Sequence, residues 1–149
     1  KESSRYIRNT DDSLSAIEVH KDTTNRSSSG QPSATVWASL AIKNITYMSG
    51  PKDEELSTHS QTYANGSVSR TTIFVRDASD VLTSTETFKD TLVRTDSDFT
   101  DDSSALGAKT QIAYYSGAKD EEIIGWSQQY TGAAGSAPYA AAPAPCSPP

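Results

Sequence analysis

The sequence contains one stretch of residues twice. Residues 47–63 read YMSGPKDEELSTHSQTY, and residues 114–130, which follow 67 positions later, read YYSGAKDEEIIGWSQQY. Farther upstream the correspondence continues at an offset of 68, through the Lys-Asp-Thr segments that begin at 21 and 89 to Arg26 and Arg94. Because self-similarity at a fixed spacing marks repeated structural units, we predict two tandem copies. Their predicted boundaries are 5–69 and 70–136, about 67 residues each.

The composition limits how such copies can fold. Each copy is too short to bury much apolar surface alone, so we expect the two copies to share one core. Only 34% of the 149 residues are hydrophobic, and such a low fraction raises disorder as an alternative. Val, Ile, Tyr and Thr nevertheless fall in alternating runs, which are typical of half-buried β-strands.

Strand–turn–strand patterns recur along the chain. In the second copy, residues 71–76 alternate as a strand, residues 77–80 are turn formers, and residues 81–88 alternate again. The first copy has a counterpart in residues 5–21. Apolar alternation on both sides of a short polar turn predicts a β-hairpin in each copy.

A longer apolar run, 34–48, predicts the third strand of the first copy. Its apolar positions change parity near Lys43 and Asn44. Because side chains alternate between the two faces of a strand, a parity change predicts a β-bulge or a break at this point.

Asn65 and Gly66 separate two further alternating runs, 56–64 and 67–76. Asn-Gly is the strongest short hairpin signal, because both residues accept a positive φ in a type I′ turn. The sequence therefore predicts an all-β fold, an antiparallel sandwich or barrel of about eight short strands. A polar lead-in, 1–4, would precede it, and the Pro/Ala-rich residues 137–149 would form an extended tail.

The outermost strands of the two copies lack the neighbours that their internal counterparts have. They could pair with each other within one chain, or each could pair with a neighbouring chain, since unpaired edges invite strand addition. The residues that we expect at these assembly edges are Arg5, Tyr6, Ile7, Arg8, Ile123, Trp126, Gln128 and Tyr130.

The net charge of −6 argues against nucleic acid as a partner, because nucleic-acid-binding proteins carry basic surfaces. No apolar run reaches the length of a membrane span.

The chain begins at Lys1 rather than Met, which we interpret as the result of a removed leader. A single cysteine, Cys146, excludes an intramolecular disulfide and leaves a free thiol or a cross-link between chains.

Four acidic residues form a candidate metal site, and calcium would be its ion, because an Asp-x-Asp start is typical of calcium loops. They are Asp96, Asp98, Asp101 and Asp102. The segment lacks the glycine of an EF-hand loop, so we favour an acidic surface loop and expect no cofactor. The Lys-Asp-Glu-Glu segments 52–55 and 119–122 are interpreted as solvated loops, with binding of a cation or a basic partner as the alternative. No catalytic motif occurs, and we expect no enzyme activity.

Three asparagines lie in Asn-x-Ser/Thr acceptor sequences for glycans: Asn25, Asn44 and Asn65. The aromatic residues of the strands could form a sugar-binding platform, but cross-strand packing already accounts for them.

These features favour a secreted structural subunit that polymerises with itself, through strand or arm exchange, into an extracellular or cell-surface filament like a pilus. A viral coat subunit, located in the virion, is the first alternative. A monomeric carbohydrate- or calcium-binding module is the second.

Overall fold

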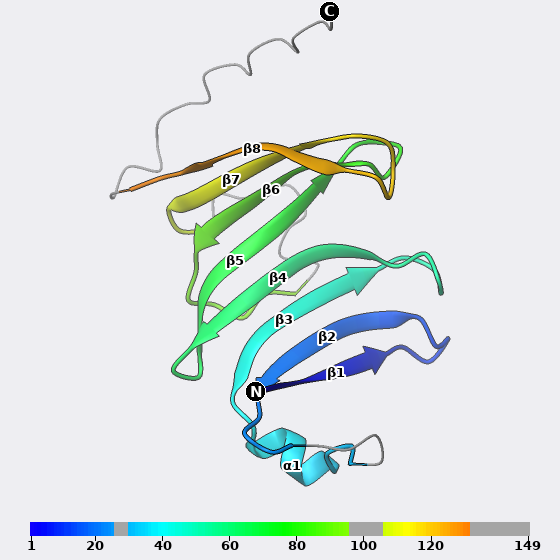
Figure 1. Cartoon of the computed structure of the whole chain (residues 1–149), viewed down its shortest axis with the longest axis vertical. Helices are drawn as coiled ribbons and strands as arrows, with labels where there is room; N and C mark the ends of the chain where they lie inside the picture. Colours follow the sequence, from blue (N-terminus) through cyan, green and yellow to red (C-terminus); the bar gives the residue numbers. More distant parts are fainter. Residues whose placement is uncertain (26–29, 96–105, 132–149) are drawn as a thin grey trace, which may run out of the picture.

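The structure, a computed structural model, describes residues 1–25, 30–95 and 106–131. Eight strands form one open antiparallel sheet in the order of the sequence, with β1 and β8 at its opposite edges (Figure 1). The elements are β1 (Glu2–Arg8), β2 (Leu14–Lys21), α1 (Ala34–Ser39), β3 (Ile42–Ser49), β4 (Leu56–Ala64), β5 (Ser67–Arg76), β6 (Leu82–Lys89), β7 (Lys109–Ser116) and β8 (Ile123–Gln129). The all-β prediction is confirmed, and β1 extends into the segment expected as a lead-in.

The prediction of a sandwich or a barrel is wrong, because the eight strands form a single open sheet. One face carries a cross-strand row of half-buried polar residues, Thr46, Ser60, Thr72 and Thr87. We call it the threonine face. In a sandwich, a second sheet packs on the apolar side chains of the first. The threonine face does not offer a continuous apolar surface for such packing. A barrel would require β1 to pair with β8, and they lie at opposite edges.

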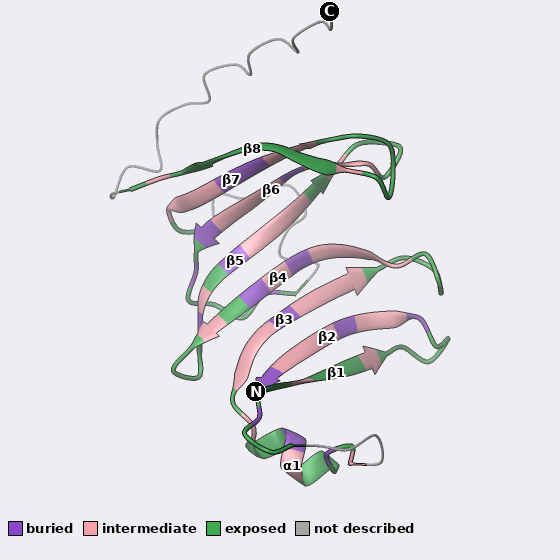
Figure 2. Cartoon of the chain, in the orientation of Figure 1, coloured by how far each residue is buried: buried purple, intermediate pink, exposed green. Residues whose placement is uncertain are grey.

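The other face, which we call the covered face, packs against the connections that follow β2 and β6. Trp37 of α1, which is 6% exposed, contacts the ring of His20 with a centroid distance of 5.0 Å. Residues 90–95 cross β4 and β5 on the same face, where Gln61 binds them. Within the sheet, the buried positions lie on the inner strands β2 to β7, whereas β8 is exposed along its length (Figure 2).

The prediction of a strand from residue 34 is wrong over its first part, which forms α1. Ser33 caps the helix, since its hydroxyl accepts a hydrogen bond from the Val36 amide at 3.4 Å. The helix turns Trp37 toward the sheet, and alternation along the sequence could not reveal this tertiary contact.

Each of the seven strand pairs contains one extra residue on one strand. Lys43 is one of them, as predicted, because Val19 pairs with Asn44 and His20 with Ile42. At five bulges the extra residue is Ser or Thr, and its hydroxyl donates to a carbonyl of the partner strand. These residues are Ser15, Thr58, Ser69, Thr83 and Thr110, at 3.1 to 3.3 Å from the carbonyl oxygen. Bulges increase the right-handed twist of a sheet.

The turns confirm the hairpin predictions. Asn65 and Gly66 have φ values of 53° and 82°, as a type I′ turn requires. Two other turns, which lie 68 residues apart, have the same geometry as each other. Asp12 and Asp80 have φ values of 70° and 61°. An arginine four residues earlier donates to the carbonyl of each aspartate, at 2.7 and 3.2 Å.

Candidate functional site

A buried polar cluster joins the two halves of the sheet at the β4–β5 pair. Gln61 and Thr71 lie directly opposite each other, and both are 0% exposed. Gln61 Nε2 donates to Thr71 Oγ1 at 3.0 Å, and Thr71 Oγ1 donates to Asp90 Oδ2 at 2.7 Å. The hydroxyl therefore acts as acceptor and donor at once, so a strand pair in the centre of the sheet is connected to the segment that covers it.

Gln61 also holds the backbone of residues 90–95. Its Nε2 donates to the Leu92 carbonyl at 2.9 Å, and its Oε1 accepts from the Arg94 amide at 3.0 Å. This geometry resembles strand pairing, because one side-chain amide satisfies a backbone acceptor and a backbone donor. It fixes the covering segment over β4 and β5.

Asp90 and Arg94 complete the cluster as a buried ion pair. Arg94 donates from Nε to Asp90 Oδ2 at 2.9 Å and from Nη2 to Oδ1 at 3.1 Å. Burial raises the pKa of the Asp90 carboxyl, but the hydrogen bonds from Arg94 and Thr71 outweigh it, and the net pKa is lowered. The carboxylate is therefore the stable form, and its bidentate partner offsets the cost of desolvation.

The β1 edge carries the same bonds in part. Ser3 Oγ donates to Asp22 Oδ2 at 2.8 Å, and the Thr24 amide donates to Asp22 Oδ1 at 2.9 Å. At the β4–β5 pair, Thr71 and the Leu92 amide make the equivalent bonds to Asp90, 68 residues later. Within the described ranges, no strand pairs with the outer side of β1. A glutamine equivalent to Gln61 would have to come from such a strand.

The β8 edge is exposed. Ile123, Ile124 and Trp126 are 68%, 57% and 44% exposed, respectively. Trp126 stacks on Tyr114 with a centroid distance of 4.4 Å, just as His59 stacks on Tyr47 at 4.3 Å. Apolar side chains on an unprotected edge favour association with another strand.

The structure places the predicted edge residues on these two strands. Arg5, Tyr6, Ile7 and Arg8 lie on β1, and Ile123, Trp126 and Gln128 lie on β8. Tyr130 follows β8, and its amide donates to the Thr110 carbonyl at 2.8 Å. The two groups are not brought together, because they occupy opposite edges of the sheet.

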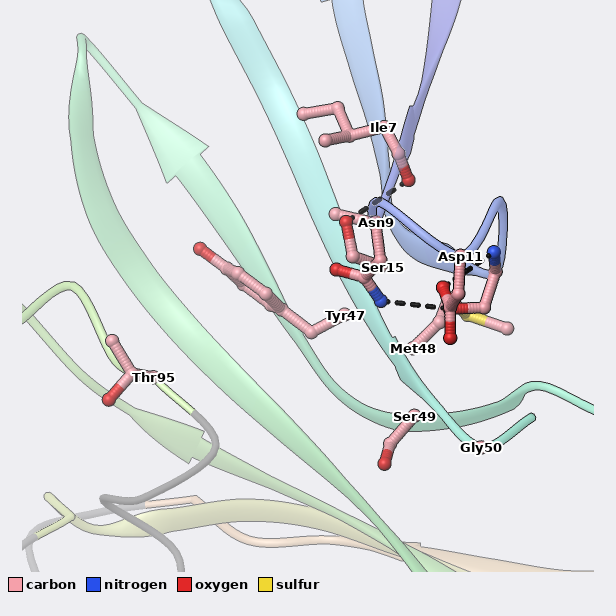
Figure 3. Close-up of a pocket in the computed structure, with 11 residues that line it drawn as sticks. Ile7, Asn9, Asp11, Ser15, Tyr47, Met48, Ser49, Gly50 and Thr95 are labelled. Carbon is pink, nitrogen blue, oxygen red and sulfur yellow. Dashed lines mark hydrogen bonds between the residues drawn. The ribbon is translucent and has the colours of Figure 1, made fainter. Parts of the chain in front are cut away.

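A cavity of about 590 Å³ opens on the covered face beside the β1–β2 turn (Figure 3). Tyr47 and Thr95 lie on one side of it, and Asn9 and Asp11 lie on the other. Asp11 accepts from the amide and hydroxyl of Ser13 at 3.1 and 2.6 Å, and these bonds lower its pKa. The polar groups of the turn are therefore already engaged with one another.

The Lys-Asp-Glu-Glu loops are largely exposed, and each also bonds to a neighbouring turn. Glu55 accepts from the Leu14 amide at 2.6 Å, and Glu122 accepts from the Leu82 amide at 2.9 Å. Lys52 pairs with Asp12 at 2.7 Å. Each loop thus connects one hairpin to the next.

The glycan acceptors lie in different settings. Asn65 is exposed at a turn, and Asn25 is exposed and accepts a hydrogen bond from the Lys1 ammonium group. Asn44 is half-buried on β3, and its Oδ1 accepts from Thr46 Oγ1 at 3.1 Å.

The calcium candidates Asp96, Asp98, Asp101 and Asp102 lie outside the described residues, as do Cys146 and the tail 137–149. In the part of the chain that the structure describes, no three His, Cys, Asp or Glu side chains gather around a common point that could hold a metal. The helix in those ranges is too short and too polar to cross a bilayer.

Sequence reasoning missed the buried cluster of Gln61, Thr71, Asp90 and Arg94. A signal was present, because Asp90 and Arg94 have counterparts in Asp22 and Arg26, and Gln61 recurs as Gln128.

Comparison with known protein families, with characterised proteins and with solved structures gives no match to this chain.

Proposed function

We propose that the sheet consists of two copies of one four-stranded unit, β1–β4 and β5–β8. Matching bulges support this. Ser15 and Thr83 are the extra residues of the first strand pair in each unit, and their hydroxyls make the same bond. The extra residues of the third pair, Thr58 and Gly125, also correspond, 67 positions apart.

We propose that the protein is a structural subunit that assembles with itself through β1 and β8 into an extracellular filament. The observation that carries the proposal is the placement of two exposed edges at opposite ends of one open sheet. An edge strand presents unpaired amide and carbonyl groups. Because the two edges differ, the contact between copies is head to tail, and such contacts extend into filaments when they do not close.

The extracellular assignment rests on the three glycan acceptor sequences, of which Asn25 and Asn65 are exposed. Surface glycans are therefore proposed as a modification, and other copies of the chain as the main partner. A coat subunit would use the same edges in a contact that closes, so electron microscopy distinguishes closed shells from fibres.

A binding module is the second candidate, and the cavity beside Tyr47 is the specific observation that favours it. An aromatic ring that faces carboxylate and amide groups across a cavity suits a sugar ligand. Such a module would remain monomeric and would bind sugars in solution.

Light scattering over a concentration series tests the proposal. We expect particles far above the 15.9 kDa of one chain, and we expect Ile124→Lys to suppress them, because an edge charge opposes strand addition. Ala78→Lys is the control, since it adds the same charge at an exposed turn. A wild-type chain that stays monomeric up to about 1 mM, equivalent to an association free energy weaker than about −4 kcal/mol, would refute self-assembly.

A further inference from the structure

We infer that β8 of one molecule pairs with β1 of the next in the register of the internal β4–β5 pair, so that Gln128 binds at Ser3 and Asp22 of the neighbour. This inference rests on the proposed function and specifies its contact. It assigns a binding site on the first edge, and its occupant is a second copy of this chain.

The internal pair supplies the register. On the β4–β5 pair, His59 lies opposite Ile73, Ser60 opposite Thr72, Gln61 opposite Thr71, and Thr62 opposite Arg70. The positions 67 residues after the β4 members are on β8, and the positions 68 residues before the β5 members are on β1. The implied pairs are Trp126 with Arg5, Ser127 with Ser4, Gln128 with Ser3, and Gln129 with Glu2.

The receiving half of this contact is already assembled on the first edge. Ser3 donates to Asp22, which is 1% exposed, as Thr71 donates to Asp90. The backbone bond also corresponds, because the Asp22 amide donates to the Lys1 carbonyl at 3.1 Å. The Asp90 amide donates to the equivalent carbonyl at 3.3 Å. A glutamine opposite Ser3 therefore meets a hydroxyl already oriented as donor to a carboxylate, so that the hydroxyl oxygen can accept from the amide.

The donating half lies on the last edge. Gln128 is directly opposite Ile112, as Gln61 is opposite Ile45. Both glutamines therefore project from the covered face, two residues beyond an aromatic ring that stacks on a tyrosine. Gln128 is exposed, whereas Gln61 is fully buried. Gln61 has β5 beside it and residues 90–95 over it, whereas no strand among the described residues pairs with the outer side of β8.

The charges of the implied pairs are compatible. None of the four places like charges opposite each other, which would oppose pairing. Arg5, which lies 3.6 Å from Glu18, would face the Trp126 ring. A guanidinium group over an indole face adds a cation–π attraction.

A disulfide test reads the register directly. The variant S4C/S127C, with C146S to remove the native thiol, places thiols at opposed positions of the inferred pair. Opposed Cα atoms lie about 4.5–5.5 Å apart, within the range of a disulfide. The fold should tolerate these changes and those of the control described below, because the substituted positions on the two edges are exposed: Ser4, Tyr6 and Ser127. Ser4 and Ser127 are on opposite edges, so cross-links form only between molecules.

We expect S4C/S127C to give a ladder of covalent oligomers on mild oxidation, visible without reductant. Y6C/S127C, shifted by two residues on the same face, is the matched control, and we expect little cross-linking from it. A stronger ladder from the control would overturn the register. We also expect Q128A to raise the concentration needed for assembly about tenfold, the effect of losing one or two hydrogen bonds. Q129A, on the opposite face, should leave this concentration nearly unchanged.

The outcomes separate the two proposals. If the wild-type chain assembles but S4C/S127C does not cross-link and Q128A assembles normally, the register is wrong and edge-mediated assembly survives. If the wild-type chain remains monomeric, both proposals fail.

Discussion

Thr71→Val removes one hydroxyl from the centre of the buried cluster and changes little else. Valine has nearly the shape of threonine and the same preference for strands, so the strand itself is not perturbed. The Thr71 hydroxyl makes two bonds, one to the Gln61 amide at 3.0 Å and one to the Asp90 carboxylate at 2.7 Å. Thr72→Val is the matched control, because the Thr72 hydroxyl lies on the threonine face, is half-buried and bonds to the Thr87 hydroxyl at 2.9 Å.

The magnitude follows from the partners. A hydrogen bond to a charged group contributes about 1.5–3 kcal/mol, and a neutral one about 1 kcal/mol. Gln61 keeps its bond to Leu92, and Asp90 keeps its bonds to Arg94, so neither group is left wholly unsatisfied. We therefore expect T71V to lower the free energy of unfolding by about 2–3 kcal/mol and T72V by less than about 1 kcal/mol.

Urea unfolding followed by circular dichroism, below the assembly concentration and at pH 7, measures both variants. In a thermal scan, T71V should melt about 5–10 °C below the wild type for a chain of this size. An equal or smaller loss for T71V than for T72V would refute the view that the cluster stabilises the fold.

Four further substitutions test other features. Gly125→Thr should raise stability by about 1 kcal/mol, since a Cβ there lies 3.7 Å from the Tyr114 carbonyl and a hydroxyl could bond it as at the other bulges; an unchanged urea midpoint would contradict this. Gly117→Ala should cost more than about 2 kcal/mol, because φ is +135° and the new Cβ would lie 2.6 Å from a carbonyl oxygen. Gly66→Ala, where φ is +82° and no atom lies near the new Cβ, should cost only about 1 kcal/mol. If urea unfolding gave the same loss of stability for Gly117→Ala and Gly66→Ala, the predicted clash at Gly117 would be wrong. Because the pKa of Asp90 is lowered on folding, its contribution is complete above about pH 3.9 and is lost as the pH falls through the folded value. Asp90→Asn should therefore remove the loss of stability that protonation of Asp90 causes at low pH. An unaltered curve of stability against pH would contradict this prediction.

The strands were predictable because their signals are local. The alternation around Asn65-Gly66 needs only neighbouring residues, and the hairpin at this position is confirmed. The bulge at Lys43 was also found, since a change of parity is visible in the sequence. The helix over the first part of the same run, Ala34–Ser39, was missed, because the tertiary contact of Trp37 decides it.

The open sheet and its polar cluster could not be predicted from local patterns. Gln61 and Asp90 are 29 positions apart, and only the path of residues 90–95 across the sheet brings them together. The choice of one sheet over a sandwich depends on what covers each face. The candidate edges were inferred from the repeat alone, and their role in assembly stays a prediction.

The meander order of the strands has a mechanical consequence. Lys1 precedes β1 at one edge, and Thr131 follows β8 at the other, so tension between these points pulls across the strands instead of along them. Such a load falls on one or two hydrogen bonds at a time, and the outer strands peel away successively. A molecule built in this way yields gradually under extension, and each released strand lengthens it by about 3.3 Å per residue.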